Sequence, residues 1–396
     1  MTRNEFKTKL SHQVLLLDGA TGTELAKRGL PGGTPPESWL LDHPEAIIAV
    51  HNDYAAAGSD IVYAPTFGGN RLKLAESGLE KETFAINRKL AELTVKNLPG
   101  KLVFGDMSPS GQFVEPVGEL AFEESVAIYR EQAEALVAGG VAGFAVETML
   151  DLQEARAALI GIREVSDLPV IVTMTFDKNG RTLTGCGAVN ALLAIQELGA
   201  DAFGCNCSTG PDSMAELIRE MKPYALIPLV AKPNAGMPKL VDLKTVFDLG
   251  PADFARETAA LVAAGANLVG GCCGTTPEHI AALAAVVRDL EPVLPVATIP
   301  VIAASGRNLV EIGEGTKFGR LEAGADLAAV ADLALDLDDG ENEVIELVTG
   351  LLGPEVVKAV LKELAQVSML PVVLRSANPE AVEAAKRFYP GKLVVV

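Results

Sequence analysis

The chain has 396 residues, is 49% apolar and carries a formal net charge of −19. This length allows one large domain and a smaller one, and the acidic balance argues against binding to nucleic-acid phosphates. No apolar stretch is long enough to span a bilayer, and the run Val14–Leu17 is too short for the core of a signal peptide. We therefore expect a soluble, cytoplasmic protein that binds neither nucleic acid nor a membrane.

Eight short apolar runs alternate with longer helical patterns over the first three quarters of the chain. Their continuous apolar character is typical of parallel strands that are buried on both faces. The expected strands are Val14–Leu17, Asp60–Thr66, Lys101–Asp106, Gly143–Glu147, Pro169–Thr175, Asp201–Asn206, Leu226–Lys232 and Asn267–Gly271. Eight strand–helix units in about 290 residues indicate an α/β fold of the (β/α)8 TIM-barrel type. The alternative is a doubly wound open sheet, but its usual dinucleotide-binding fingerprint does not follow the first run.

Polar or thiol side chains stand at the carboxyl ends of most of these strands. They are Asp18, Thr66, Asp106, Ser108, Glu147, Cys207, Asn234, Cys272 and Cys273. In a TIM barrel all strand ends of this kind meet at one face, where active sites are built. The fold therefore predicts that these side chains share one site, although any one of them alone is more often a cap or a loop contact.

Three cysteines in two places carry the strongest chemical signal. Cys207 ends the segment Gly204-Cys205-Asn206-Cys207, and Cys272 and Cys273 are adjacent within Gly271-Cys272-Cys273-Gly274. Three thiolates can hold one Zn²⁺ and leave a fourth tetrahedral position open for a substrate. The alternative is that they are small buried apolar residues. The five cysteines of the chain form no pattern typical of a secreted disulfide framework.

The chain resembles the homocysteine methyltransferase family over about residues 10–290. The motifs that carry the resemblance are Asp18-Gly19-Ala20-Thr21-Gly22-Thr23-Glu24-Leu25, Thr66-Phe67-Gly68-Gly69-Asn70, Gly105-Asp106-Met107-Ser108-Pro109-Ser110-Gly111, Glu147-Thr148-Met149-Leu150-Asp151, Lys232-Pro233-Asn234-Ala235-Gly236 and the two cysteine segments. Within the family it is most similar to the N-terminal part of cobalamin-dependent methionine synthases. Gly69, where Ala is common, and Cys205, where an aliphatic residue is common, depart from the pattern.

The resemblance implies which residues form the site. Zinc is expected on Cys207, Cys272 and Cys273, and L-homocysteine is expected against Asp18, Gly19, Ala20, Thr21, Ser108, Glu147 and Asn234. These roles are chemically reasonable, because a carboxylate such as Glu147 can pair with an α-ammonium group. Backbone N–H groups of the glycine-rich turn can bind an α-carboxylate, and the Asn234 amide can both donate and accept.

The implied reaction is methyl transfer to the sulfur of homocysteine, giving methionine. The expected donor is methylcobalamin on a separate corrinoid protein, since the chain contains no cobalamin-binding Asp-x-His-x-x-Gly segment. One alternative is a cobalamin-free enzyme that uses betaine or S-methylmethionine. Another is a non-catalytic zinc-thiolate module that docks a corrinoid protein. A homo-oligomer is compatible with the sequence.

The last quarter of the chain predicts a second, smaller α/β domain. Residues 291–300, with three prolines, are expected to link residues 1–290 to residues 301–396. Within the tail we expect helices at Gly353–Val367 and Pro379–Phe388 and strands at Leu370–Arg375 and Lys392–Val396. The stretch 371–385 resembles part of a methyltetrahydrofolate-binding barrel, with Arg375 where that family usually has Asp. We interpret the tail as a shortened, degenerate folate domain, the alternative being an unrelated small α/β domain.

Overall fold

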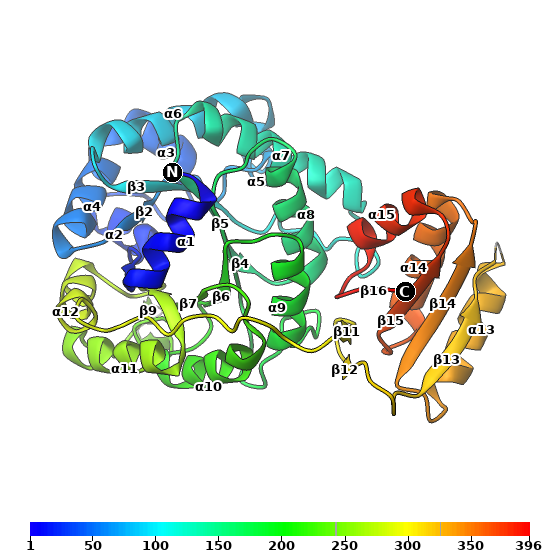
Figure 1. Ribbon diagram of the computed structural model, residues 1–396. Coiled ribbons are helices and arrows are strands. Elements are labelled where there is room, and N and C mark those ends of the chain that lie inside the picture. The colour runs from blue at the N-terminus through cyan, green and yellow to red at the C-terminus, as the bar shows by residue number, and fades with distance from the viewer. Residues whose placement is uncertain (242–243, 325) are drawn as a thin grey trace.

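The computed structural model describes residues 1–241, 244–324 and 326–396. Eight parallel strands form one sheet in the order β1-β10-β7-β6-β5-β4-β3-β2. The strands are β1 (Leu15–Leu16), β2 (Ile61–Tyr63), β3 (Leu102–Met107), β4 (Gly143–Met149), β5 (Val170–Met174), β6 (Ala202–Asn206), β7 (Leu229–Lys232) and β10 (Ala266–Val269). All eight expected strands are present, and the sheet curls into a nearly closed TIM-like barrel (Figure 1).

The barrel closes between β1 and β2 through one aspartate rather than through a strand ladder. The backbone N–H of Asp60 donates to the carbonyl oxygen of Leu16 at 2.7 Å, and Asp60 Oδ2 accepts from the N–H of Leu16 at 2.9 Å. Arg288 also pairs with Asp60 from the last barrel helix. The Asp60 carboxylate therefore replaces the missing backbone partner at the seam.

Helices surround the barrel and close its amino end. They are α1 (Arg3–His12), α2 (Thr21–Lys27), α3 (Pro36–Asp42), α4 (Pro44–Ala57), α5 (Arg71–Ala75), η1 (Glu80–Glu82), α6 (Thr83–Asn97), α7 (Phe122–Ala138), α8 (Leu152–Arg163), α9 (Ala188–Glu197), α10 (Pro211–Met221), η2 (Lys222–Tyr224), α11 (Pro251–Ala264) and α12 (Pro277–Val287). Phe6 and Leu10 of α1 pack into the barrel interior, where Phe6 lies 5.7 Å from the Phe104 ring. Because α1 fills this end, the opposite face is left for a site. A short hairpin, β8 (Lys239–Val241) and β9 (Lys244–Val246), follows β7.

The tail is a second parallel sheet of four strands in the order β13-β14-β15-β16. Its elements are the antiparallel pair β11 (Ile302–Ala304) and β12 (Leu309–Glu311), then β13 (Phe318–Glu322), α13 (Leu327–Asp338), β14 (Val344–Gly350), α14 (Pro354–Val367), β15 (Val372–Ser376), α15 (Pro379–Phe388) and β16 (Val394–Val395). The two helices and two strands expected from the sequence are all present. Residues 291–300 contain neither helix nor strand and run along the outside of the barrel toward this sheet (Figure 1).

The tail shares an apolar core with the barrel. Phe122 and Val126 of α7 belong to the same buried cluster as Leu361 of α14 and Phe388 of α15. The Phe122 and Phe388 rings lie edge to face with centroids 5.7 Å apart, an arrangement that aromatic pairs prefer. The tail is thus packed against the α7–α8 side of the barrel. Within the described residues, no helix combines the length and apolar character needed to cross a membrane.

Candidate functional site

A cavity of about 540 Å³ opens at the carboxyl ends of the barrel strands. It is lined by side chains that follow β1, β2, β3, β4, β6, β7 and β10, including Asp18, Tyr63, Asp106, Glu147, Cys207, Lys232, Cys272 and Cys273. Residues far apart in the chain therefore meet in one concave space, as expected at this face of a TIM barrel.

The three cysteines form a thiol cluster at this cavity. Cys207 follows β6 directly, whereas Cys272 and Cys273 lie in the loop after β10. Their sulfur atoms all lie within 4.8 Å of one another, and the sulfurs of Cys207 and Cys273 are 3.9 Å apart. A tetrahedral zinc with Zn–S bonds of about 2.3 Å places its sulfurs about 3.8 Å apart. The donor set and its spacing therefore fit zinc.

The thiols also share their protons unequally. Side-chain contacts with Cys272 and Cys273 lower the pKa of Cys207 to about 2. The same contact with Cys207 raises the pKa of Cys273 to about 11. The cluster thus stabilises one thiolate even before a cation is bound, and a metal ligand must be deprotonated.

Backbone contacts fix both cysteine loops against neighbouring strands. The N–H of Cys207 donates to the carbonyl of Lys232 at 3.2 Å, and the N–H of Cys272 donates to the carbonyl of Pro233 at 2.9 Å. Cys207 itself has a positive φ of 62°, a conformation that costs a non-glycine residue energy and clusters at functional sites. The loops are therefore held in place by the fold as well as by any metal.

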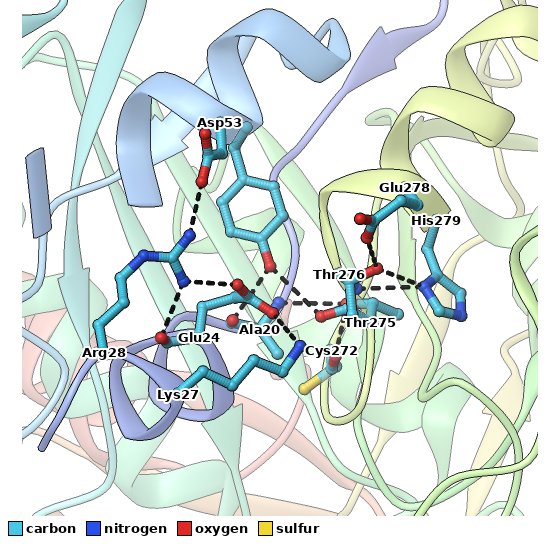
Figure 2. A network of polar contacts seen from close by, with 11 residues as sticks. Ala20, Glu24, Lys27, Arg28, Asp53, Cys272, Thr275, Thr276, Glu278 and His279 are labelled. Atoms are coloured by element: carbon cyan, nitrogen blue, oxygen red, sulfur yellow. Dashed lines mark hydrogen bonds and ion pairs between the residues drawn. The ribbon is translucent and has the colours of Figure 1, made fainter. Parts of the chain in front are cut away.

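Thr275, which lies between Ala20 and Cys272 in Figure 2, joins the first loop of the barrel to the cysteine loop, and Tyr54 supports the same junction. The Tyr54 hydroxyl donates to the carbonyl of Ala20 at 3.0 Å, and Thr275 Oγ1 accepts from the N–H of Ala20 at 3.1 Å. Thr275 Oγ1 in turn donates to the carbonyl of Cys272 at 2.7 Å. A Cβ atom on Gly19 would lie 2.8 Å from both the Thr275 and Tyr54 oxygens, so only glycine fits there. The junction couples the turn at Asp18 to the position of Cys272.

A buried ion-pair cluster lies beside the thiols. Lys232 Nζ is 3.1 Å from Glu147 Oε2 and 3.4 Å from Asp18 Oδ1, and it lies 3.8 Å from the centre of the Tyr63 ring. Burial raises the pKa of both Glu147 and Asp18, while the Lys232 charge lowers it. Burial alone would lower the pKa of Lys232, but the Glu147 carboxylate, together with Tyr63 and Asp18, raises it well above its usual value. Lys232 therefore stays charged.

Asn206 connects the carboxylate side of the site to the thiol side. Its Oδ1 accepts from the N–H of Thr148 at 2.9 Å, and its Nδ2 donates to the Thr148 hydroxyl at 2.8 Å. The same Nδ2 lies 3.8 Å from the sulfur of Cys272. Thr148 has a positive φ of 63° and follows Glu147 directly. The fully buried Asn206 thus holds the strained end of β4 that presents Glu147.

A family model described as Homocysteine S-methyltransferase matches residues 15–287, well over half of the chain. The chain belongs to the homocysteine S-methyltransferase family. The barrel is similar to the homocysteine methyltransferase MmuM from Escherichia coli in its metallated form, with a TM-score of 0.58 and 26% identity over 69% of this chain and 96% of that one. The apo form of the same protein gives a TM-score of 0.55 and 27% identity over 70% of this chain and 98% of that one.

Two methionine synthases extend the family likeness into the tail. Those of Mycobacterium leprae (strain TN) and Mycobacterium tuberculosis (strain ATCC 25618 / H37Rv) are each 30% identical to this chain over 98% of its length. The matched region is 35% of each methionine synthase, so this chain spans about a third of the length of these curated relatives. The protein is a homocysteine S-methyltransferase family enzyme related to methionine synthase.

The family residues expected at the substrate do not all lie at the cavity. Asp18, Gly19, Ala20, Thr21 and Glu147 line it, as do the three expected zinc ligands, Cys207, Cys272 and Cys273. Ser108 is buried outside this lining, where its hydroxyl donates to the carbonyl of Pro109. Asn234 is buried behind Cys207, close enough for its side chain to lower the pKa of that thiol.

The structure adds residues that sequence reasoning did not assign to the site. Lys232, Tyr63, Glu37 and Thr148 all line the cavity, together with Asp106, which was expected there. Burial and the nearby Glu147 raise the pKa of Asp106 well above its usual value, which favours a neutral carboxyl group. The sequence did contain one indication that Lys232 belongs to the site, because it is a charged residue at the end of an otherwise apolar strand.

The two departures from the family pattern have structural explanations. A Cβ atom on Gly69 would lie 2.3 Å from Asn87 Oδ1, and the Asn87 amide donates to the carbonyl of Gly69. Alanine is thus excluded by a buried asparagine. Cys205 is buried within β6 outside the thiol cluster, and so is Cys186 in the loop before α9. Burial raises the pKa of each to about 12, so both are inert thiols.

Proposed function

We propose that this enzyme transfers a methyl group to the sulfur of L-homocysteine, giving methionine, with zinc held by Cys207, Cys272 and Cys273. The observation that carries the proposal is the meeting of this thiol cluster with the buried Glu147–Lys232–Asp18 cluster in one cavity. One group of residues suits a metal that accepts a substrate sulfur, and the other suits the charged end of an amino acid. A docking module would need the first but not the second.

When bound, zinc lowers the pKa of a coordinated thiol, so that the sulfur is present as the nucleophilic thiolate at neutral pH. The protein's own residues then position the substrate. Glu147 Oε2 pairs with Lys232, and the other carboxylate oxygen is the proposed acceptor for the α-ammonium of homocysteine. No protein general base is required, since a thiolate attacks an activated methyl group without further proton removal.

The turn after β1 is proposed to bind the α-carboxylate. The backbone of Gly19, Ala20 and Thr21 lines the cavity, but the N–H of Ala20 is already bonded to Thr275 Oγ1. Within the described residues, the N–H groups of Gly19 and Thr21 have no acceptor outside helix α2, so they are the donors proposed for the α-carboxylate. Asp18 lines the cavity and is held by the N–H of Tyr63, which donates to its Oδ2 at 2.8 Å. Ser108 and Asn234 are buried outside the cavity lining and are proposed to support the loops that form it.

The proposed methyl donor is methylcobalamin on a separate corrinoid protein. The support is the likeness to methionine synthases over 98% of the chain, tail included. The second candidate is a small donor such as S-methylmethionine or betaine. It is favoured by the size of the cavity, about 540 Å³, which exceeds what one homocysteine needs.

One assay separates the candidates. Zinc-loaded protein is incubated with L-homocysteine and, in turn, methylcobalamin bound to a corrinoid protein, free methylcobalamin, betaine and S-methylmethionine, and methionine is measured. Methionine formed with the methylated corrinoid protein and not with the small donors supports the first proposal. Turnover with betaine or S-methylmethionine replaces it with the second, and no turnover together with no homocysteine binding supports a docking module.

A further inference from the structure

The ammonium group of Lys232 directs its N–H donors at protein groups within the site. Lys232 ends β7 and is 3% exposed. Its Nζ has three N–H donors, and its three neighbours are Glu147 Oε2, Asp18 Oδ1 and the face of the Tyr63 ring. An aromatic face accepts a cation through its negative quadrupole. With each donor direction taken, Lys232 is not a group that binds a substrate carboxylate.

The two carboxylates that pair with Lys232 differ in how many further hydrogen bonds they can accept. Asp18 uses one oxygen for Lys232 and the other for the N–H of Tyr63. Glu147 uses Oε2 for Lys232, and within the described part of the chain Oε1 has no hydrogen-bond donor, although Glu147 lines the cavity. The ion pair therefore occupies one oxygen of Glu147 and leaves the other as the acceptor that this cavity-lining residue can offer to a ligand.

The charges of the cluster match one additional cation. Two carboxylates share one ammonium, so with both ionised the ion-pair cluster carries a single negative charge. A buried uncompensated charge is costly, so the cluster is completed by one small cation such as an α-ammonium group. Without the lysine, two like charges would share the site.

We propose that Lys232 is the positioning residue that orients Glu147 toward the α-ammonium group, and that it thereby makes the enzyme select amino-acid thiols over thiols without an amino group. This inference rests on the function proposed above and adds to it the determinant of substrate class. Lys232 acts through Glu147 and touches neither the reacting sulfur nor the methyl group.

The test compares two thiols that differ only in the amino group. Dissociation constants of zinc-loaded protein are measured by calorimetry for L-homocysteine and for 4-mercaptobutanoate, which keeps the thiol, the chain length and the carboxylate. A charge-assisted hydrogen bond corresponds to roughly a 10- to 150-fold preference for homocysteine in the wild type. In Lys232→Met this preference is expected to fall to less than about threefold, with zinc content unchanged.

The matched control is Lys101→Met, because Lys101 lies at the opposite end of the barrel and donates to the carbonyl of Ser59. It is expected to keep the wild-type preference. If Lys232 acts through Glu147, adding Lys232→Met to Glu147→Gln causes no further loss of preference, as a double-mutant cycle measures. Equal weakening of both thiols in Lys232→Met, with the preference retained, overturns the inference and leaves a purely structural lysine.

A second measurement does not depend on any variant folding. In a crystal structure of the wild-type protein with L-homocysteine, the inference expects the substrate ammonium on Glu147 Oε1 and the Lys232–Glu147 pair intact. Lys232 displaced from Glu147, or bound to the substrate carboxylate, overturns it. If the wild type binds neither thiol, the proposed function fails instead, and that outcome is distinct from an unchanged preference in Lys232→Met.

Discussion

The guanidinium of Arg156, on barrel helix α8, donates to the carbonyl oxygen of Phe388 at the end of tail helix α15, at 3.0 Å. It also donates to the carbonyls of Lys386 at 2.8 Å and Arg387 at 3.1 Å. The last carbonyls of a helix have no partner within the helix and attract positive charge. Arg156 is 1% exposed, so a residue of the barrel caps a helix of the tail within a buried interface.

Replacing Arg156 with methionine should detach the tail from the barrel. The substitution keeps much of the apolar stem but removes the side-chain donor to the carbonyls of Lys386 and Arg387, whereas the Phe388 carbonyl keeps Gln153 Nε2. Leaving a buried acceptor unpaired costs about 1–3 kcal/mol for each group. We expect the free energy of unfolding to fall by about 3 kcal/mol and limited proteolysis to release residues beyond about 290. The control is Arg387→Ala at the same interface, whose exposed pairs with Glu123 and Glu164 contribute less than about 1 kcal/mol. Equal effects of the two substitutions would contradict the capping role.

Serine in place of any one of Cys207, Cys272 and Cys273 should abolish stoichiometric zinc binding. Three thiolates are expected to hold the metal. When one of them is lost, two protein ligands remain, which is too few to bind zinc tightly. Cys186→Ser and Cys205→Ser are the controls and should retain one zinc per chain, because both lie outside the cluster. Elemental analysis of the purified variants decides the matter. In the wild type, zinc should dissociate as pH falls, since protons compete for the thiolates.

Glu147→Gln should weaken homocysteine binding while leaving zinc in place. The amide keeps the shape of the side chain but loses the charge that pairs with an α-ammonium group, at a cost of about 1.5–3 kcal/mol, or roughly 10- to 150-fold in dissociation constant. Calorimetry with L-homocysteine and zinc analysis of the same sample measure both quantities. Glu131→Gln, on the outer side of α7 where Glu131 pairs with Arg71, is the control. An unchanged dissociation constant for Glu147→Gln would remove this residue from the substrate site.

The tail should not bind methyltetrahydrofolate productively. Four parallel strands are half of what a barrel needs to close. Arg375, which stands where the folate-binding family usually has Asp, is half-exposed at the end of β15 and pairs with Glu346 of β14. Its positive charge cannot accept the hydrogen bonds that a carboxylate offers to a pterin. Calorimetry with the full chain is the measurement, and micromolar affinity for methyltetrahydrofolate would show that the tail is a working folate site.

The barrel and its thiols could be predicted from the sequence because their signals are local. Each strand is one apolar run, and Cys207, Cys272 and Cys273 follow such runs, so the fold alone brings them together. The direction in which a side chain points was harder to predict than its position in the fold. Ser108 also follows a strand, but its hydroxyl bonds to Pro109 instead of facing the cavity. A strand end says where a residue lies and not which way its side chain points.

Ion pairs and hydrogen bonds between residues far apart in the chain could not be predicted from the sequence. Lys232 and Asp18 are 214 residues apart, and a lysine that ends an apolar strand is equally compatible with solvent exposure. The seam at Asp60 and the capping of α15 by Arg156 are also pairings between distant segments. Such contacts depend on the closed geometry, since burying a polar or charged group is costly unless the fold brings a partner to it.

The strand that presents Glu147 passes directly into the helix that carries Arg156. After β4 ends at Met149, Asp151 caps the first turn of α8, and Arg156 follows within the next turn and a half. The substrate wall and the anchor of the tail are therefore neighbouring parts of one stiff segment. Because Arg156 ties this segment to α15, a displacement of the tail relative to the barrel would be passed along α8 to the strand end that carries Glu147.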